Sequence, residues 1–118
     1  MDLEFNVTTE ENCTRVAVTG EIDLYSVKLL KEKITILLDG RKVTNLLLDL
    51  TGVNYIDSTG LGILIGIKRR CTEKGGRMIL VSGSDRITNI FSITGLNKIF
   101  TICKTVEEAV ADLKNEGA

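Results

Sequence analysis

The feature that most constrains the fold of this chain is a pair of short, nearly continuous apolar runs. Residues 46–50 (Leu-Leu-Leu-Asp-Leu) and Met78–Val81 are typical of strands that are covered on both faces. The residues between them, 58–74, predict a helix whose first two turns are apolar almost all round, and such a helix is expected to be largely buried. Strands that alternate with helices are joined by right-handed crossovers, so the two runs predict parallel strands at the centre of a sheet.

The rest of the chain extends this pattern into an α/β fold. Residues 3–8 and 15–19 alternate apolar and polar side chains, which predicts an antiparallel hairpin joined through the polar residues 9–14. Helical spacing of apolar residues predicts three further helices, and one more strand follows. These helices span 26–40, 85–94 and 106–113, and the last strand spans 99–103. We therefore expect a mixed, mainly parallel sheet with an N-terminal antiparallel hairpin and about four helices, in a single domain over residues 1–118.

Composition argues against several classes of function. The 118 residues include no histidine, which is the commonest general base and zinc ligand. Cys13, Cys71 and Cys103 lie far apart and form no Cys-x-x-Cys motif, which favours reduced thiols over a metal site. The formal charge is -1, whereas a protein that grips nucleic acid needs an excess of Lys and Arg. We therefore expect no metal, no cofactor and no direct nucleic-acid partner.

The start of the chain does not resemble a secretory signal. Such a signal is basic and then apolar, whereas residues 1–4 (Met-Asp-Leu-Glu) carry two acidic side chains. No apolar run approaches the roughly 18 residues that a membrane span requires. The sequence therefore predicts a cytoplasmic protein without a membrane partner.

The segment 52–62 carries the residues best suited to a function. It brings Asp57, Ser58 and Thr59 to the start of the predicted helix, just after a buried strand, where function gathers in open α/β folds. One interpretation is capping, because the side-chain oxygens of these residue types accept the unpaired amide hydrogens of a first helical turn. Three such residues exceed what one cap needs, however, and a phosphate placed there would gain from the helix dipole and the free amides. Both interpretations remain open at this point.

Three glycines follow in the same part of the chain. Gly60, Gly62 and Gly66 resemble a loose dinucleotide fingerprint, but nine residues separate Leu50 from Gly60, whereas a phosphate-binding turn follows its strand at once. That spacing argues against a dinucleotide site. Ser58, Gly62 and Gly66 are instead spaced by four and share one stripe of the helix. The stripe predicts either a packing groove within the fold, which we favour, or a docking surface.

Charged residues in two further places need no special function. Asp23 ends the motif Gly-Glu-Ile-Asp at 20–23, and capping of the helix that follows would explain it. A basic cluster near the end of the second helix could contact an acidic partner, although cations are favoured at helix C-termini in any case. The cluster comprises Lys68, Arg69, Arg70, Lys74 and Arg77.

Together these segments resemble those of a bacterial protein family. The segments are Gly-Glu-Ile-Asp at 20–23, Asp-Ser-Thr-Gly-Leu-Gly at 57–62, and Phe91 with Thr-Gly-Leu at 94–96. The chain resembles a bacterial anti-sigma factor antagonist, a stand-alone STAS domain. The resemblance covers the whole chain, and the block at 57–62 is its most specific part.

The resemblance implies a phosphorylation switch. Ser58 would be phosphorylated by a partner that is both an anti-sigma factor and an ATP-dependent serine kinase. The unphosphorylated form would bind this kinase and free the sigma factor, phosphorylation would end the binding, and a separate serine phosphatase would restore it. Asp23 matches the family's acidic residue beside the phosphorylated serine. The residues expected to contact the partner are Asp23, Asp57, Ser58, Thr59, Gly60, Gly62 and Gly66.

Two other classes of function remain open. Relatives with the same fold serve stress-signalling complexes, lipid transport or anion transporters, and a subunit of such a complex would bind its neighbours whatever the state of Ser58. A nucleotide-binding protein would instead be saturated by a nucleotide without any partner. We favour the phosphorylatable binding module, which is a substrate of a kinase and not itself an enzyme.

Overall fold

The structure is a computed structural model that describes residues 3–9, 13–40 and 45–115. The elements are β1 (Glu4–Thr9), β2 (Thr14–Ile22), α1 (Val27–Gly40), β3 (Leu46–Ile56), α2 (Ser58–Glu73), β4 (Met78–Val81), α3 (Asp85–Ile93), the short 3-10 helix η1 (Leu96–Lys98), β5 (Thr101–Cys103) and α4 (Val106–Asn115). This order of strands and α-helices is the one that the sequence predicts. Residues 10–12 of the expected hairpin turn and the first two residues of the acidic start lie outside the described residues.

One five-stranded sheet organises these elements, with the strands in the order β1-β2-β3-β4-β5. β1 and β2 pair antiparallel, and the other pairs are parallel, which confirms the predicted mixed sheet with its N-terminal hairpin. The two apolar runs become the first half of β3 and the whole of β4, and Leu46 pairs with Met78 in the register. Their apolar character reflects cover on both faces of the sheet.

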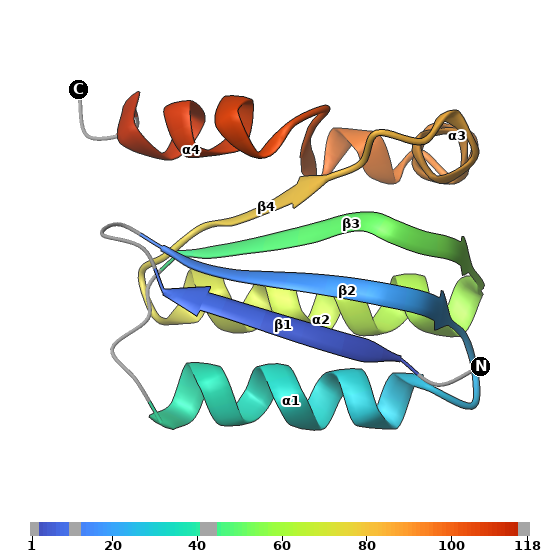
Figure 1. Cartoon of the computed structure of the whole chain (residues 1–118), viewed down its shortest axis with the longest axis horizontal. Coiled ribbons are helices and arrows are strands. Elements are labelled where there is room, and N and C mark those ends of the chain that lie inside the picture. The colour runs from blue at the N-terminus through green and yellow to red at the C-terminus, as the bar shows by residue number, and fades with distance from the viewer. Residues whose placement is uncertain (1–2, 10–12, 41–44, 116–118) are drawn as a thin grey trace.

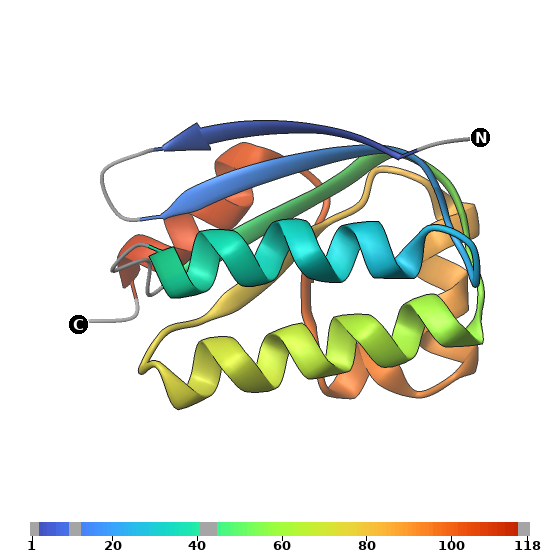
Figure 2. The same ribbon diagram turned by 90° about the horizontal axis from the view of Figure 1, so that it is seen from below.

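Helices form a layer on each side of this sheet. Figures 1 and 2 show α1 and α2 side by side across one face, and α4 against the opposite face. The larger core lies under α1 and α2 and includes Leu30, Leu48 and Leu64, while a smaller core under α4 includes Leu47 and Ala109. Successive residues of β3 therefore alternate between the two cores, as the period of a strand requires.

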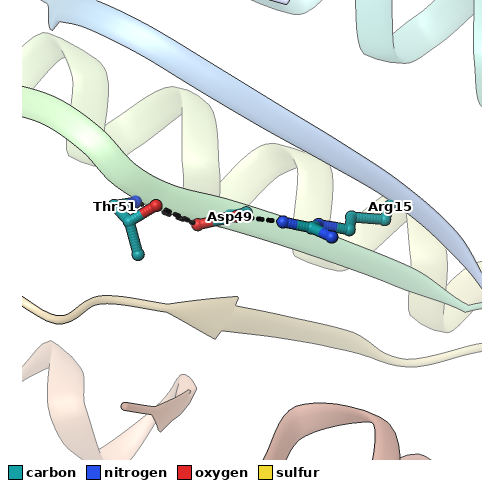
Figure 3. A network of polar contacts seen from close by, with 3 residues as sticks. All are labelled: Arg15, Asp49 and Thr51. Atoms are coloured by element: carbon teal, nitrogen blue, oxygen red, sulfur yellow. Dashed lines mark hydrogen bonds and ion pairs between the residues drawn. The ribbon is translucent and has the colours of Figure 1, made fainter. Parts of the chain in front are cut away.

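A buried carboxylate lies on β3 among these apolar residues. Asp49 is 3% exposed, and its side chain accepts hydrogen bonds from the Arg15 guanidinium at 2.9 Å and from the backbone N–H and hydroxyl of Thr51 at 3.0 and 2.8 Å (Figure 3). Burial raises the pKa of Asp49, but these hydrogen bonds outweigh it and hold the pKa below its ordinary value. The carboxylate is thus buried in its charged form with its partners in place.

Two predicted boundaries are wrong. β3 runs on to Ile56, six residues past the predicted end at Leu50, so the nine-residue loop inferred before Gly60 does not exist. Register shifts between β2 and β3 break the regular alternation of side chains in the second half of β3. The sequence of that half therefore lacks the period of two that indicates a strand. β5 is shorter than predicted, because it begins at Thr101 and not at residue 99.

Candidate functional site

The candidate site lies where β2 and β3 end and where α1 and α2 begin. Ile22 and Ile56 are paired at the ends of the two strands, and Figure 1 shows both strand ends and both helix starts at one end of the molecule. Asp57 alone separates β3 from α2. This short connection holds the start of α2 against the end of β2. The segment lies at the carboxyl ends of parallel strands, where function gathers in open α/β folds.

Asp57 is the N-cap of α2. One carboxylate oxygen, Oδ1, accepts a hydrogen bond from the backbone N–H of Gly60 at 2.9 Å. The other, Oδ2, accepts one from the backbone N–H of Leu24 at 3.0 Å, and the Asp57 N–H donates to the carbonyl of Ile22 at 3.1 Å. Asp57 therefore caps the helix and also ties it to the turn that follows β2.

Asp23 holds the other end of that turn. Its Oδ1 accepts hydrogen bonds from the backbone N–H groups of Tyr25 at 3.0 Å and Ser26 at 3.1 Å. The Ser26 hydroxyl donates to the carbonyl of Glu21 at 2.7 Å and accepts a hydrogen bond from the Asp23 N–H at 3.0 Å. The carboxylate thus holds the turn that leads into α1, because the amides that it bonds, those of Tyr25 and Ser26, precede the first residue of the helix.

Ser58 and Thr59 are exposed at the first two positions of α2. Within the described residues, neither hydroxyl takes part in a hydrogen bond, since Asp57 supplies the cap. Capping therefore accounts for one of the three polar residues in this segment and leaves two hydroxyls facing solvent.

The three glycines of α2 have different surroundings. A Cβ on Gly60 would come within 2.7 Å of Ile22 Cγ2 and 2.8 Å of the Ile22 carbonyl oxygen, so this glycine allows close packing of α2 on β2. A Cβ on Gly62 or Gly66 would meet nothing within 4 Å among the described residues, and both positions are exposed.

These surroundings and the bounds of β3 correct three interpretations. The stripe formed by Ser58, Gly62 and Gly66 is not the packing groove that we favoured, and α2 is not buried on all sides. Gly60 follows the end of β3 closely, so the spacing argument against a dinucleotide site was wrong. The close packing of Gly60 against Ile22 nevertheless explains a glycine at this position without a nucleotide.

The basic cluster is largely explained by ion pairs. Arg70 binds Asp39 of α1 at 2.7 Å, with Lys74 at 3.9 Å from the same carboxylate, and Arg77 binds Asp112 of α4 at 2.9 Å. Contacts with Asp39 account for a raised pKa of the Arg70 guanidinium. Arg70 and Lys74 thus connect the end of α2 to α1, and Arg77 connects the segment before β4 to α4.

Comparison with known proteins identifies the family. The model of the STAS domain matches residues 4–109 of this chain. The chain belongs to the STAS domain family. An anti-sigma-B factor antagonist from Bacillus subtilis is 36% identical over 110 residues, which span 93% of this chain and 99% of that protein. This STAS domain is therefore a member of the anti-sigma factor antagonists, which are binding modules and not enzymes.

Solved structures agree with this fold. An anti-sigma factor antagonist from Mycobacterium paratuberculosis superposes with a TM-score of 0.87 at 24% identity, covering 96% of this chain and 95% of the other. The Bacillus cell fate determinant SpoIIAA in its phosphorylated form superposes with a TM-score of 0.68 at 26% identity, covering 93% and 99%.

The STAS domain also carries an apolar surface that the sequence patterns did not reveal. Leu24 is 63% exposed and Tyr25 is 91% exposed in the turn between Asp23 and Ser26, and Tyr55 near the end of β3 is 47% exposed. The signal was present as two large apolar residues inside a capping turn, a place where polar residues are usual. Exposed aromatic side chains next to a candidate site are typical of protein interfaces.

Two further properties of the described part of the chain bear on other classes of site. None of its helices is long and apolar enough to cross a membrane. The same residues contain no group of three or more His, Cys, Asp and Glu side chains that could hold a metal ion.

Proposed function

We propose that this STAS domain is a phosphorylatable anti-sigma factor antagonist with Ser58 as its switch. In the unphosphorylated form it binds an anti-sigma factor that is also a serine kinase, and the sigma factor is released. Phosphorylation of Ser58 ends this binding, and a serine phosphatase restores it. The supporting observation is the Ser58 hydroxyl, which is exposed at the first position of α2 and has no hydrogen bond among the described residues, while the carboxylates of Asp57 and Asp23 are bonded to backbone amides.

The chemistry assigned to this chain is that of an acceptor. The Ser58 Oγ forms a bond to the γ-phosphorus of ATP, the bond from that phosphorus to the β,γ-bridging oxygen breaks, and ADP and the hydroxyl proton leave. The base and the metal-bound ATP are supplied by the kinase. The phosphoryl group adds about −1.5 to −2 charges at the start of α2, where the helix dipole partly offsets them.

The relatives support this proposal in outline. One is named as an antagonist of an anti-sigma-B factor, and another was solved in a phosphorylated form. We further propose that residues 1–118 form one STAS domain, that the domain works in the cytoplasm, and that the partner contacts the surface formed by Asp23, Asp57, Ser58, Thr59, Gly60, Gly62 and Gly66. Gly60 contributes to that surface through the position of α2, because its own Cα faces Ile22.

The proposal is tested by mapping the phosphate. Incubation with ATP and the anti-sigma factor kinase of the same organism should add one phosphoryl group, located on Ser58 by fragmentation mass spectrometry. Ser58→Ala should abolish the mass increase, and Thr59→Ala, the matched control, should leave it intact. Undiminished labelling of Ser58→Ala, or phosphate on Thr59, would contradict the assignment. Kinase binding that is equal for the unmodified and phosphorylated protein would favour a constitutive subunit of a larger complex.

A further inference from the structure

The candidate site contains a direct connection between the helix that bears Ser58 and the exposed apolar turn. The Asp57 carboxylate uses one oxygen for Gly60 in the first turn of α2 and the other for the Leu24 N–H. Asp57 immediately precedes Ser58, and Leu24 immediately precedes Tyr25. The Asp57 side chain therefore connects the residue next to the Ser58 hydroxyl with the backbone of the turn. Within the described residues, this carboxylate gives the only side-chain hydrogen bond between the turn and α2.

The turn has the character of a docking element. Leu24 and Tyr25 are exposed, and the Asp23 carboxylate fixes the backbone of the turn by accepting hydrogen bonds from the N–H groups of Tyr25 and Ser26. A rigid turn that presents an aromatic side chain loses little conformational entropy on binding. Because the turn is bonded to the residue beside Ser58, it adjoins the surface that the anti-sigma factor contacts in the proposed function, and the anti-sigma factor is the partner to which Tyr25 would be an anchor.

We propose that Asp57 is a positioning residue that couples the phosphorylation state of Ser58 to the shape of the turn at Leu24 and Tyr25. In the unmodified protein, the carboxylate holds the turn in its binding shape. A phosphoryl group on Ser58 repels this carboxylate and competes for the amides at the start of α2. Asp57 then releases the Leu24 N–H, and the turn no longer presents Tyr25 in the shape that the anti-sigma factor binds. This inference rests on Ser58 being the switch.

The coupling is measurable on the isolated protein, without a kinase. Phosphoserine is installed at position 58 during translation, and amide spectra are compared with those of the unmodified protein. The Leu24 amide proton should move upfield as it loses a charged acceptor, while the Tyr25 and Ser26 amides, which are bonded to Asp23, should move much less. An unchanged Leu24 resonance in the phosphoprotein would overturn the inference, even if Ser58 proves to be the switch.

Two matched variants separate the coupling from the loss of a charge. In Asp57→Asn, the amide oxygen caps α2 as well as Asp does, but the NH₂ group cannot accept from Leu24. In Asp23→Asn, a negative charge is also lost, yet the amide oxygen still accepts from both Tyr25 and Ser26. Asp57→Asn should reproduce the Leu24 shift of the phosphoprotein, and Asp23→Asn should leave the Leu24 resonance in place.

Affinity for the same anti-sigma factor completes the test. If the binding shape of the turn falls to about a tenth of the population, Asp57→Asn should weaken binding about tenfold. Tyr25→Ser, which removes the anchor, should weaken binding about thirtyfold or more. Equal affinities of Tyr25→Ser and the unchanged protein would refute the docking role of the turn. An unchanged protein that fails to bind would instead refute the proposed function, while the Leu24 resonance would still decide the coupling.

Discussion

The same substitution at three positions of α2 should change stability in opposite directions. Gly60, Gly62 and Gly66 all lie in one helix, and glycine costs a helix interior up to about 1 kcal/mol relative to alanine. On helix propensity alone, all three Gly→Ala variants would be stabilised. The surroundings of the three Cα atoms predict otherwise, because Gly60 faces β2 and the other two face open space.

The contacts set the size of each effect. At Gly60 the added methyl group would lie 2.7 and 2.8 Å from two atoms of Ile22 and 3.0 Å from Ile56 Cγ2. One of these atoms is the Ile22 carbonyl oxygen, which accepts from the Asp57 N–H, so it cannot move away without weakening that hydrogen bond. Overpacking of this kind costs about 1–3 kcal/mol, which exceeds the gain in propensity. At Gly62 and Gly66 nothing opposes a gain of about 0.5–1 kcal/mol each.

Urea denaturation followed by circular dichroism gives the three unfolding free energies directly. Gly60→Ala should unfold at lower urea concentration, and Gly62→Ala and Gly66→Ala at higher concentration, with similar slopes. In thermal melts the shifts should be about 4 °C for each kcal/mol in a domain of this size. A Gly60→Ala variant as stable as Gly62→Ala would refute the close packing of α2 on β2.

Two further predictions concern the core and the docking stripe. Asp49→Asn should lower the unfolding free energy by about 1–3 kcal/mol near neutral pH, because the Arg15 guanidinium loses its charged partner. Because the pKa of Asp49 is lowered in the folded state, this stabilisation is present above the unfolded-state pKa and is lost as the pH falls through the folded-state pKa. In urea titrations, the difference in unfolding free energy between the two proteins should therefore shrink below about pH 4. A difference that stays constant with pH would contradict this prediction. Gly62→Leu should fold normally, since no described atom lies within 4 Å of the added Cβ, but it should bind the anti-sigma factor kinase more weakly; unchanged affinity in a calorimetric titration would remove Gly62 from the interface.

The fold was predictable where buried apolar residues recur along the sequence at the spacing of a helix or a strand. The apolar runs that became β3 and β4 and the spaced residues of α1 gave both the type and the order of the elements. The end of β3 was missed because the register shifts opposite Thr19 and Glu21 interrupt the alternation, and a bulge depends on the pairing of two strands. No single segment of sequence contains that information.

The sequence indicated which residues form the candidate site, but not which of them packs, caps or stays exposed. Sequence spacing grouped Gly60 with Gly62 and Gly66, whereas the fold sets Gly60 against Ile22 and leaves the other two in solvent. Sequence likewise left Asp57, Ser58 and Thr59 as equal candidates for one cap. Which of them caps depends on the backbone angles at the junction, where Asp57 is extended and Ser58 is already helical.

Capping and the proposed switch are compatible in this segment, because Asp57 provides the cap and the neighbouring Ser58 is the proposed phosphate acceptor. Asp57 accepts the hydrogen bond from the Gly60 N–H, so the Ser58 hydroxyl is not needed as a cap. A modification of Ser58 therefore removes no atom that takes part in the cap. The modification nevertheless acts on the cap, since the new charge lies next to the carboxylate that also holds Leu24. Asp23 keeps the rest of the turn in place through Tyr25 and Ser26. In a site built in this way, a phosphoryl group on Ser58 should affect one backbone amide and the apolar side chains beside it, while the strand ends paired at Ile22 and Ile56 should keep their registration.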